Sequence, residues 1–393
     1  MRTWRLMSGV LVLASLVMSA CATATSATTT TVPSTTTTAA VSNLACATRI
    51  VGTWSTFRQA NETISISVKA LDIGGMGPAA KAGYGGILLF GTTAPAKFSA
   101  IVATLQRETP SKYSMLVMTD EEGGGVERLT NLVATLPWAQ TMGKNLSASQ
   151  ITAEGKRVGI SMKAAGVNTD LAPVLDVDGR AVEPGAANPD GYRSFGGVPS
   201  KVATDGVAFL SGLREAGVTA VVKHFPGLGH ATGNTDYGPA ATLPWATLKT
   251  KGLVPFQAAI NAGVTAVMIS NATIPGFSSL PASISPAVIQ YLRNKMGFKG
   301  LIVTDSLSAG ALSLIHLGVP AASVKALEAG ADLILAGSAT TPAASLHLAL
   351  LTSNAIQRAV TSGALPQATL LSAAAQVLAS ENPSLVCSGV GST

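Results

Sequence analysis

The sequence predicts a single-domain α/β fold, a TIM (β/α)8 barrel, from three observations. Eight short apolar runs alternate with longer helical stretches. Several helical stretches end in Ala-Gly, and a glycine directly after a helix takes the left-handed conformation that ends it. Polar or glycine-rich segments follow the apolar runs, as they do at the carboxyl ends of barrel strands. A doubly wound open sheet is the alternative, although no GxGxxG motif supports a dinucleotide-binding version of it.

The individual elements follow from this alternation. The runs that we expect to form strands are residues 64–70, 86–90, 114–119, 168–175, 220–222, 266–270, 301–304 and 332–335. The helical stretches between them include residues 149–165, 201–216, 248–262 and 286–296. The Ala-Gly ends place Gly166, Gly217, Gly263 and Gly330 just past four helices. Eight such units in one domain favour a closed barrel.

Residues 1–20 have the features of a lipoprotein signal peptide. Arg2 and Arg5 supply the positive start, and residues 6–18 are almost wholly apolar but too short to span a bilayer. Two small residues then precede Cys21, which resembles a bacterial lipobox. We expect cleavage before Cys21 and lipidation of its thiol. An ordinary cleaved signal followed by a chance cysteine is the alternative.

The next segment, residues 21–42, is expected to be a disordered tether. After Cys21 it is nearly all Ala, Thr, Ser and Val, and it carries no charge. A stretch of this composition cannot bury enough apolar surface to form a core. The folded barrel domain is therefore expected over residues 43–393.

Two further cysteines, Cys46 and Cys387, lie at opposite ends of the expected domain. In an oxidising compartment they can form one disulfide that joins the two ends of the domain. Chain ends often lie close together, which favours this pairing. Two unrelated buried thiols are the alternative.

Charge is sparse along the whole chain. Charged residues make up 12% of the 393 residues, and the formal net charge is +6. Without Arg2 and Arg5, 24 basic residues remain against 20 acidic residues, so the mature chain carries +4. This composition argues against a nucleic-acid-binding protein, and the mild positive charge suits an anionic cell wall.

Acids and bases follow successive strand-like runs. The third run leads into Asp120, the fifth into Lys223 and His224, and the seventh into Asp305. In a barrel these positions meet at one mouth, where TIM-barrel enzymes place their active sites. A single strand-end Asp can simply cap the next helix, but the whole set together indicates a catalytic site.

Five motifs together resemble glycoside hydrolase family 3. They are DEEGG at residues 120–124, APVLDVD at 172–178, RSFG at 193–196, KHFPGLG at 223–229 and TDSLS at 304–308. They occur in the family's order and spacing, and the resemblance extends from about residue 49 to residue 381. The chain looks most like the family's single-domain β-N-acetylglucosaminidases (β-hexosaminidases) of the actinobacterial lipoprotein type. It ends too soon for the second α/β domain of the family's β-glucosidases.

The resemblance implies a retaining exo-glycosidase that hydrolyses terminal β-linked N-acetylglucosamine through a covalent glycosyl-enzyme. Asp305 matches the family's nucleophile. The positions that hydrogen-bond the sugar hydroxyls in the family are matched by Asp120, Arg128, Arg193, Lys223 and His224. Charged partners suit this role because hydrogen bonds to charged groups are stronger than those between neutral groups.

The acid/base position departs from the family's pattern. The family's mobile loop ends in Asp-Ser-His, and that His is the acid/base; the matching residues here are Asn234, Thr235 and Asp236. We expect Asp236 to act as acid/base with Asn234 orienting it, since a carboxylic acid with a raised pKa can transfer the same proton. His230 is the second candidate, and a loop that only binds glycan is the third. Glycines in the loop would let it swing, so that Asp236 reaches the site with substrate bound.

The expected substrate is a peptidoglycan-derived glycan or muropeptide outside the membrane. We expect a monomer with no cofactor, no metal and no nucleic-acid partner. Its lipid would hold it at the outer face of the cytoplasmic membrane or in the cell envelope. The alternatives are a catalytically impaired glycan-binding lipoprotein and a β-glucosidase or phosphorylase of the same family. A carboxylate as acid/base disfavours the phosphorylase, because it would repel an anionic acceptor.

Overall fold

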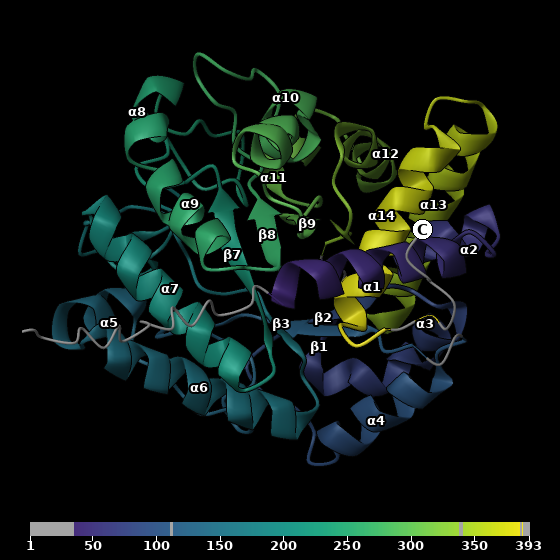
Figure 1. The fold of residues 1–393 in the computed structure, drawn as a ribbon, viewed down its shortest axis with the longest axis horizontal. Coiled ribbons are helices and arrows are strands. Elements are labelled where there is room, and N and C mark those ends of the chain that lie inside the picture. The colour runs from purple at the N-terminus through teal and green to yellow at the C-terminus, as the bar shows by residue number, and fades with distance from the viewer. Residues whose placement is uncertain (1–34, 111–112, 338–340, 386, 388–393) are drawn as a thin grey trace, which may run out of the picture.

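The computed structural model describes residues 35–110, 113–337, 341–385 and 387. Eight strands lie at its centre (Figure 1). They are β1 (Ile64–Lys69), β2 (Gly86–Phe90), β3 (Leu116–Thr119), β6 (Thr169–Asp170), β7 (Thr219–Phe225), β8 (Ala266–Ile269), β9 (Leu301–Thr304) and β10 (Ile334–Leu335). Each of the eight expected runs contains or overlaps one of these strands.

The strands close into a barrel. Hydrogen-bonded neighbours follow the order β10-β1-β2-β3-β6-β7-β8-β9, and all of these pairs are parallel. The ring is completed between β9 and β10. There the amide of Thr304 donates to the carbonyl of Leu333 at 2.9 Å, and the amide of Leu307 donates to that of Leu335 at 3.0 Å. The predicted TIM barrel is confirmed, and the open sheet is excluded.

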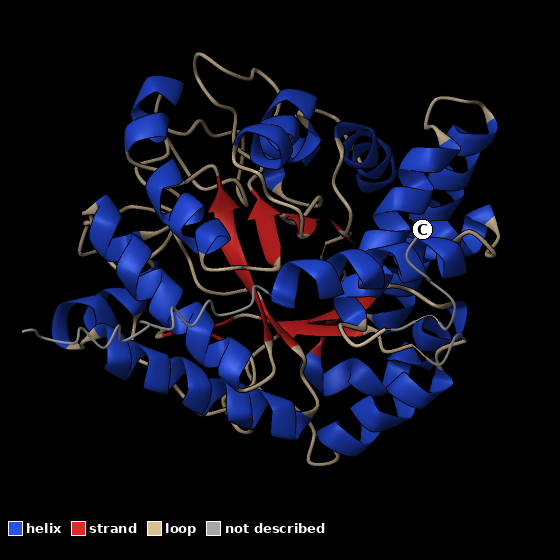
Figure 2. Cartoon of the chain, viewed as in Figure 1, coloured by secondary structure: helices blue, strands red, loops and turns tan. Residues whose placement is uncertain are grey.

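Helices lie outside the strands, as the blue and red elements of Figure 2 show. The α-helices are α1 (Thr35–Val51), α2 (Thr56–Glu62), α3 (Gly77–Ala82), α4 (Phe98–Glu108), α5 (Ala139–Asn145), α6 (Ala148–Ala165), α7 (Pro199–Glu215), α8 (Trp245–Thr250), α9 (Leu253–Asn261), α10 (Pro286–Gln290), α11 (Gly310–Ser313), α12 (Val319–Ala329), α13 (Pro342–Thr361) and α14 (Gln367–Glu381). Shorter turns are the 3-10 helices η1 (Ala70–Met76), η2 (Gly191–Arg193) and η3 (Ala282–Ile284) and the π-helical η4 (Tyr291–Lys295). A hairpin of β4 (Glu121–Gly123) and β5 (Val126–Glu127) follows β3.

Two expected helices are interrupted, whereas all four Ala-Gly ends form as predicted. The helix expected over residues 248–262 is split into α8 and α9, where Gly252 lies close to the carbonyl of Pro226 at the start of the loop after β7. The helix expected over residues 286–296 turns from α10 into the π-helical η4. The glycines after the four Ala-Gly helices have φ angles of +93°, +75°, +79° and +106°.

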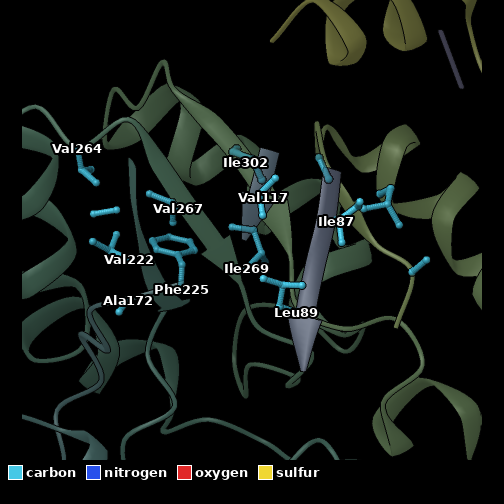
Figure 3. Packing of buried hydrophobic residues seen from close by; sticks show 14 of the residues in the cluster. Ile87, Leu89, Val117, Ala172, Val222, Phe225, Val264, Val267, Ile269 and Ile302 are labelled. Carbon is cyan, nitrogen blue, oxygen red and sulfur yellow. The ribbon is translucent and has the colours of Figure 1, made fainter. Parts of the chain in front are cut away.

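The strands separate two apolar cores, because successive side chains of a strand point to opposite faces. One core consists almost wholly of strand residues such as Leu88, Met268 and Val303, which fill the barrel. The alternate residues face outward and pack against the helices. Figure 3 shows Leu89 and Ile302 in this second, larger core. The two layers hold the strands rigidly, so the residues at the strand ends have fixed positions.

The two ends of the described chain lie side by side, as purple α1 and yellow α14 in Figure 1 show. The two helices pack through an apolar cluster that includes Ala47, Val51 and Leu378. Cys46 and Cys387 form a disulfide, with Cα atoms 5.5 Å apart. The N-terminal helix is thereby joined to the end of the barrel.

The helix α1 begins at Thr35 and so includes residues 35–42 of the segment expected to be a tether, and the domain boundary at residue 42 stays a prediction. Packing of Ala47 and Val51 holds the helix in place. Extending an existing helix is much easier than nucleating one. The expected signal peptide and Cys21 lie outside the described residues. Within the described segments, no helix has both the length and the hydropathy of a membrane span.

Candidate active site

The predicted site residues gather at the carboxyl ends of the strands. Asp120 directly follows β3, and Asp305 directly follows β9. Lys223 and His224 lie near the carboxyl end of β7, where the register against β8 shifts between Val222 and Phe225. Because of this irregularity, two consecutive side chains both face the site, whereas a regular strand would turn one of them away.

Lys223 is the centre of a buried ionic cluster. Its Nζ lies 2.6 Å from Oδ1 of Asp120 and 2.5 Å from Oε1 of Glu122. Glu122 also accepts two hydrogen bonds from the guanidinium of Arg193, at 2.7 and 2.9 Å. Burial alone would raise the pKa of Glu122, but Arg193 and Lys223 hold it well below its usual range. The cluster is thus fully ionised, and its geometry is fixed by charge-assisted hydrogen bonds.

Arg128 stands at the rim of this cluster. Its Nε lies 3.6 Å from Oδ2 of Asp120, and its guanidinium lies 5.6 Å from the centre of the Phe90 ring. The side chain of Arg128 is 27% exposed, compared with 3% for Lys223. Arg128 therefore presents its charge toward solvent at the mouth, where a ligand can reach it.

His224 is oriented by Asp176. The Nδ1 of His224 lies 2.6 Å from Oδ2 of Asp176, and the backbone amides of His224 and Leu228 both donate to Oδ1 of Asp176. Burial and the neighbouring Arg193 lower the pKa of His224 to about 4. The imidazole is therefore neutral near pH 7. With Nδ1 donating to Asp176, the Nε2 lone pair faces outward, 3.5 Å from a nitrogen of Arg193.

Asp190 lies beside Asp176 and is completely buried. Burial and the charge of Asp176 raise the pKa of Asp190 well above its ordinary value. Ligand atoms of Asp176, Asp190 and His224 all lie within 4.8 Å of one another, which is a spacing that a metal ion could use. Here the hydrogen bond from His224 already occupies Asp176, and the cationic Arg193 lies close by. We therefore interpret the trio as support for His224.

Asp305 is held by backbone on both sides. Its amide donates to the carbonyl of Ile269 at 2.8 Å, and its Oδ1 accepts a hydrogen bond from the amide of Ser306 at 2.7 Å. Burial raises the pKa of Asp305. The ammonium group of Lys223 opposes that rise, and the carboxylate of Asp236 adds to it. Asp236 thus acts on Asp305 across the mouth of the barrel.

The loop after β7 carries Asp236 to this position. The amide of Asp236 donates to Oδ1 of Asn234 at 2.9 Å, which closes a tight turn. The amide of Asn234 in turn donates to the carbonyl of Ala186 at 2.9 Å. Asn234 therefore fixes the backbone at Asp236 through its own side chain, while the side chain of Asp236 is exposed at the mouth.

His230 lies on the same loop but faces a different group. Its side chain is 49% exposed, and its Nε2 lies 4.0 Å from Oδ1 of Asp178. It lines a small surface pocket together with Leu248 and Lys251. The charged side chains that shift the pKa of Asp305 are instead Asp236 and Lys223.

No role was predicted from the sequence for Glu122, Asp176 or Asp190. Glu122 and Asp176 lie inside the DEEGG and APVLDVD motifs, close to the ends of the apolar runs at residues 114–119 and 168–175, and that position was a usable signal. Asp190 precedes Arg193 in an irregular segment, and only the fold brings it to Asp176.

Comparison with known proteins places the chain beside a group of carbohydrate-active enzymes. Residues 78–380 match the sequence profile described as the glycosyl hydrolase family 3 N terminal domain. The beta-hexosaminidase LpqI of Mycobacterium tuberculosis is 35% identical over 232 residues, which are 56% of this chain and 58% of that protein. The beta-hexosaminidase of Methylococcus capsulatus is 31% identical over 274 residues, 68% of this chain and 79% of that protein. The chain thus spans little more than half the length of the mycobacterial relative.

Solved structures show the same similarity. A family 3 glycosyl hydrolase from Mycobacterium smegmatis superposes with a TM-score of 0.74 and 31% identity, covering 84% of this chain and 98% of that one. A beta-N-acetylhexosaminidase from Beutenbergia cavernae gives a TM-score of 0.75 and 28% identity, covering 84% and 99%. Both superpositions extend over most of the described barrel.

Proposed function

The chain belongs to glycoside hydrolase family 3, and on this basis we propose that it is a retaining β-N-acetylglucosaminidase. It would remove one terminal β-linked N-acetylglucosamine at a time from a glycan. The family membership and the beta-hexosaminidase relatives support the reaction class. The observation that carries the proposal is the pairing of two carboxylates, Asp305 and Asp236, at the mouth of the barrel beside a cluster of fixed charges.

The first step forms a glycosyl-enzyme. A carboxylate oxygen of Asp305 attacks the anomeric carbon, and the bond from that carbon to the glycosidic oxygen breaks. Asp236 gives its proton to the departing oxygen, so the leaving group departs as a neutral alcohol. Backbone contacts to Ile269 and Ser306 hold Asp305 in line for the attack.

The second step releases the sugar. Asp236, now a carboxylate, takes a proton from water, whose oxygen attacks the anomeric carbon while the bond to Asp305 breaks. The product keeps its β configuration, and both carboxyl groups return to their starting states. The carboxylate of Asp236 raises the pKa of Asp305.

The ionic cluster would bind the sugar ring. Asp120 and Arg128 offer an acceptor and a donor at the rim, and Lys223 and Arg193 offer donors further in. His224 offers the neutral Nε2 as an acceptor, because Asp176 binds the other nitrogen. Groups that are already positioned lose little conformational entropy when the hydroxyls bind, so the sugar is bound in one orientation.

The substrate source and location are part of the same proposal. A secreted glycosyl hydrolase from Arthroderma benhamiae is 33% identical over 263 residues, which supports export of this chain. We propose that it acts outside the membrane as a lipid-anchored monomer on peptidoglycan fragments. The disulfide between Cys46 and Cys387 suits an oxidising compartment.

The test is hydrolysis of an aryl β-N-acetylglucosaminide whose aglycone is a poor leaving group, with the matching β-glucoside as control. Wild type should cleave the first and spare the second. Asp305→Ala should abolish turnover, because no nucleophile remains. Asp236→Ala should lower turnover by about 10²- to 10⁴-fold, the usual contribution of a general acid.

His230→Ala is the matched control on the same loop and should change turnover little. A sharp loss in His230→Ala with full activity in Asp236→Ala would reassign the acid/base. A folded wild type that binds muropeptides without turnover would instead establish a glycan-binding protein. NMR of the first-formed product distinguishes retention from inversion, and an α-anomer would overturn the retaining mechanism.

A further inference from the structure

The loop that carries Asp236 is attached to the segment that follows Asp305. The amide of Gly310 donates to the carbonyl of Asp236 at 3.0 Å, and the amide of Ala311 donates to the carbonyl of Thr235 at 2.9 Å. Both amides belong to the first turn of α11, where a helix has donors without acceptors of its own. The loop therefore supplies acceptors that this turn needs, and the two segments stabilise each other.

Gly310 is the point of closest approach. A Cβ at this position would lie 2.5 Å from the carbonyl carbon of Tyr237 and 2.7 Å from the amide nitrogen of Gly238. These are backbone atoms, which cannot rotate aside as a side chain can. The opposite side of the contact is open, since a Cβ at Gly238 would lie 3.6 Å from the flexible end of Leu314. A side chain at residue 310 would therefore push the loop away from α11.

Asp305 is held independently of Gly310, whereas the loop that carries Asp236 keeps mainly its own internal turn. Thr235 is 2% exposed, and Asn234 fixes the turn before Asp236. Asp305 is bonded through its amide to β8. A change at residue 310 should thus displace Asp236 while Asp305 stays in place.

We propose that Gly310 is a positioning residue for the acid/base. Because glycine has no side chain, the loop can dock on α11, and docking places the carboxyl group of Asp236 opposite the nucleophile. The inference rests on the proposed function, because it concerns the proton that Asp236 gives to the leaving group. Residues 305–311 form one short segment that includes both Asp305 and the docking site of the loop. The position of Asp236 relative to Asp305 therefore depends on the docked loop.

The test compares two substrates on Gly310→Ala. One is an aryl N-acetylglucosaminide with a poor leaving group, which needs protonation; the other is the 2,4-dinitrophenyl glycoside, whose leaving group departs without it. We expect kcat/KM on the first to fall by about 10- to 100-fold, a partial loss of the contribution of a general acid. The value on the second should fall by less than about 3-fold, because formation of the glycosyl-enzyme then needs no acid. A purely structural role would lower both values together.

Two further variants keep the test decisive. Gly238→Ala adds the same methyl group on the open side of the contact and should leave both substrates unaffected. If Gly310→Ala does not fold, Ala311→Pro removes one docking hydrogen bond at a position where a helix tolerates proline, and it should show the same selective loss. Wild-type rates on both substrates, or equal losses on both, would overturn the role of Gly310. A wild type inactive even on the dinitrophenyl glycoside would instead refute the proposed function.

Discussion

Lys223 shows how a single residue can serve both stability and binding. Its ammonium group is buried between Asp120 and Glu122, and Arg193 completes the cluster. Burial lowers the pKa of Lys223, but the two carboxylates raise it above its ordinary value. The ammonium group is therefore permanently charged, and each buried charge of the cluster is balanced by the opposite charges beside it.

Lys223→Met should lower the free energy of unfolding by about 3–5 kcal/mol, because removing one partner leaves buried charges uncompensated. Urea unfolding followed by circular dichroism measures the loss. Lys156→Met is the matched control, since the Lys156–Glu215 pair is half-exposed on both sides and such pairs contribute about 0–1 kcal/mol. Equal effects of the two substitutions would contradict the assigned importance of the buried cluster.

Asp305 sets the acid limb of the pH profile. Burial raises its pKa, and the charge of Asp236 raises it further. Asp305 must be ionised to attack, so kcat/KM should rise with pH through a value above the ordinary aspartate pKa of 3.8. His224, with its pKa of about 4, is neutral near pH 7.

Asp236→Asn tests the electrostatic link between the two carboxyls. Removing the negative charge favours the ionised form of Asp305 and lowers its pKa. The acid limb of kcat/KM on the dinitrophenyl glycoside should therefore move to lower pH. An unchanged limb would show that Asp236 does not influence the nucleophile, and a shift to higher pH would contradict the assigned sign.

At the scale of elements, α6 and α7 pack backbone to backbone. A Cβ at Gly212 of α7 would lie 2.2 Å from the carbonyl oxygen of Thr152, and one at Gly155 of α6 would lie 2.5 Å from that of Phe209. The glycines let the two helices approach closely, and the strands β6 and β7, which pair with each other, connect to these helices. The helix pair thus supports β7, which carries Lys223 of the ionic cluster, and its neighbour β6.

Gly212→Ala should destabilise the fold by about 1–3 kcal/mol or more, since overpacking forces the helices apart. Gly74→Ala is the control, because nothing lies within 4 Å of a Cβ there. Thermal unfolding of both variants measures the difference. A Gly212→Ala protein as stable as Gly74→Ala would show that the helices have room to move.

At the scale of the whole molecule, the disulfide joins residues separated by 341 positions. Such a crosslink restricts the unfolded chain and typically stabilises a fold by about 2–4 kcal/mol. The paired variant Cys46→Ser/Cys387→Ser should lower the midpoint of thermal unfolding. Reductant should lower the midpoint of wild type to the same level and leave the variant unchanged; a wild type insensitive to reductant would contradict this role.

The fold could be predicted because local patterns and the barrel agree. Each expected strand run, such as residues 86–90 or 301–304, is short, apolar and followed by a polar segment, and each forms a strand. The Ala-Gly helix ends depend only on backbone conformation, so they too could be located. The break between α8 and α9 was not predicted, although Gly252 and Pro255 mark it locally, because proline lacks the amide that a continuous helix needs.

The candidate site, like the fold, could be predicted from the sequence only in part. The sequence by itself determined the barrel and the strand-end positions of Asp120, Lys223, His224 and Asp305, because those depend on local hydrophobic periodicity. Only the tertiary structure decided the partners: Glu122 beside Lys223, Asp176 behind His224, and the docking of the acid loop at Gly310. These contacts join segments far apart in the chain. Their geometry is fixed by barrel closure and backbone packing, which no local pattern encodes.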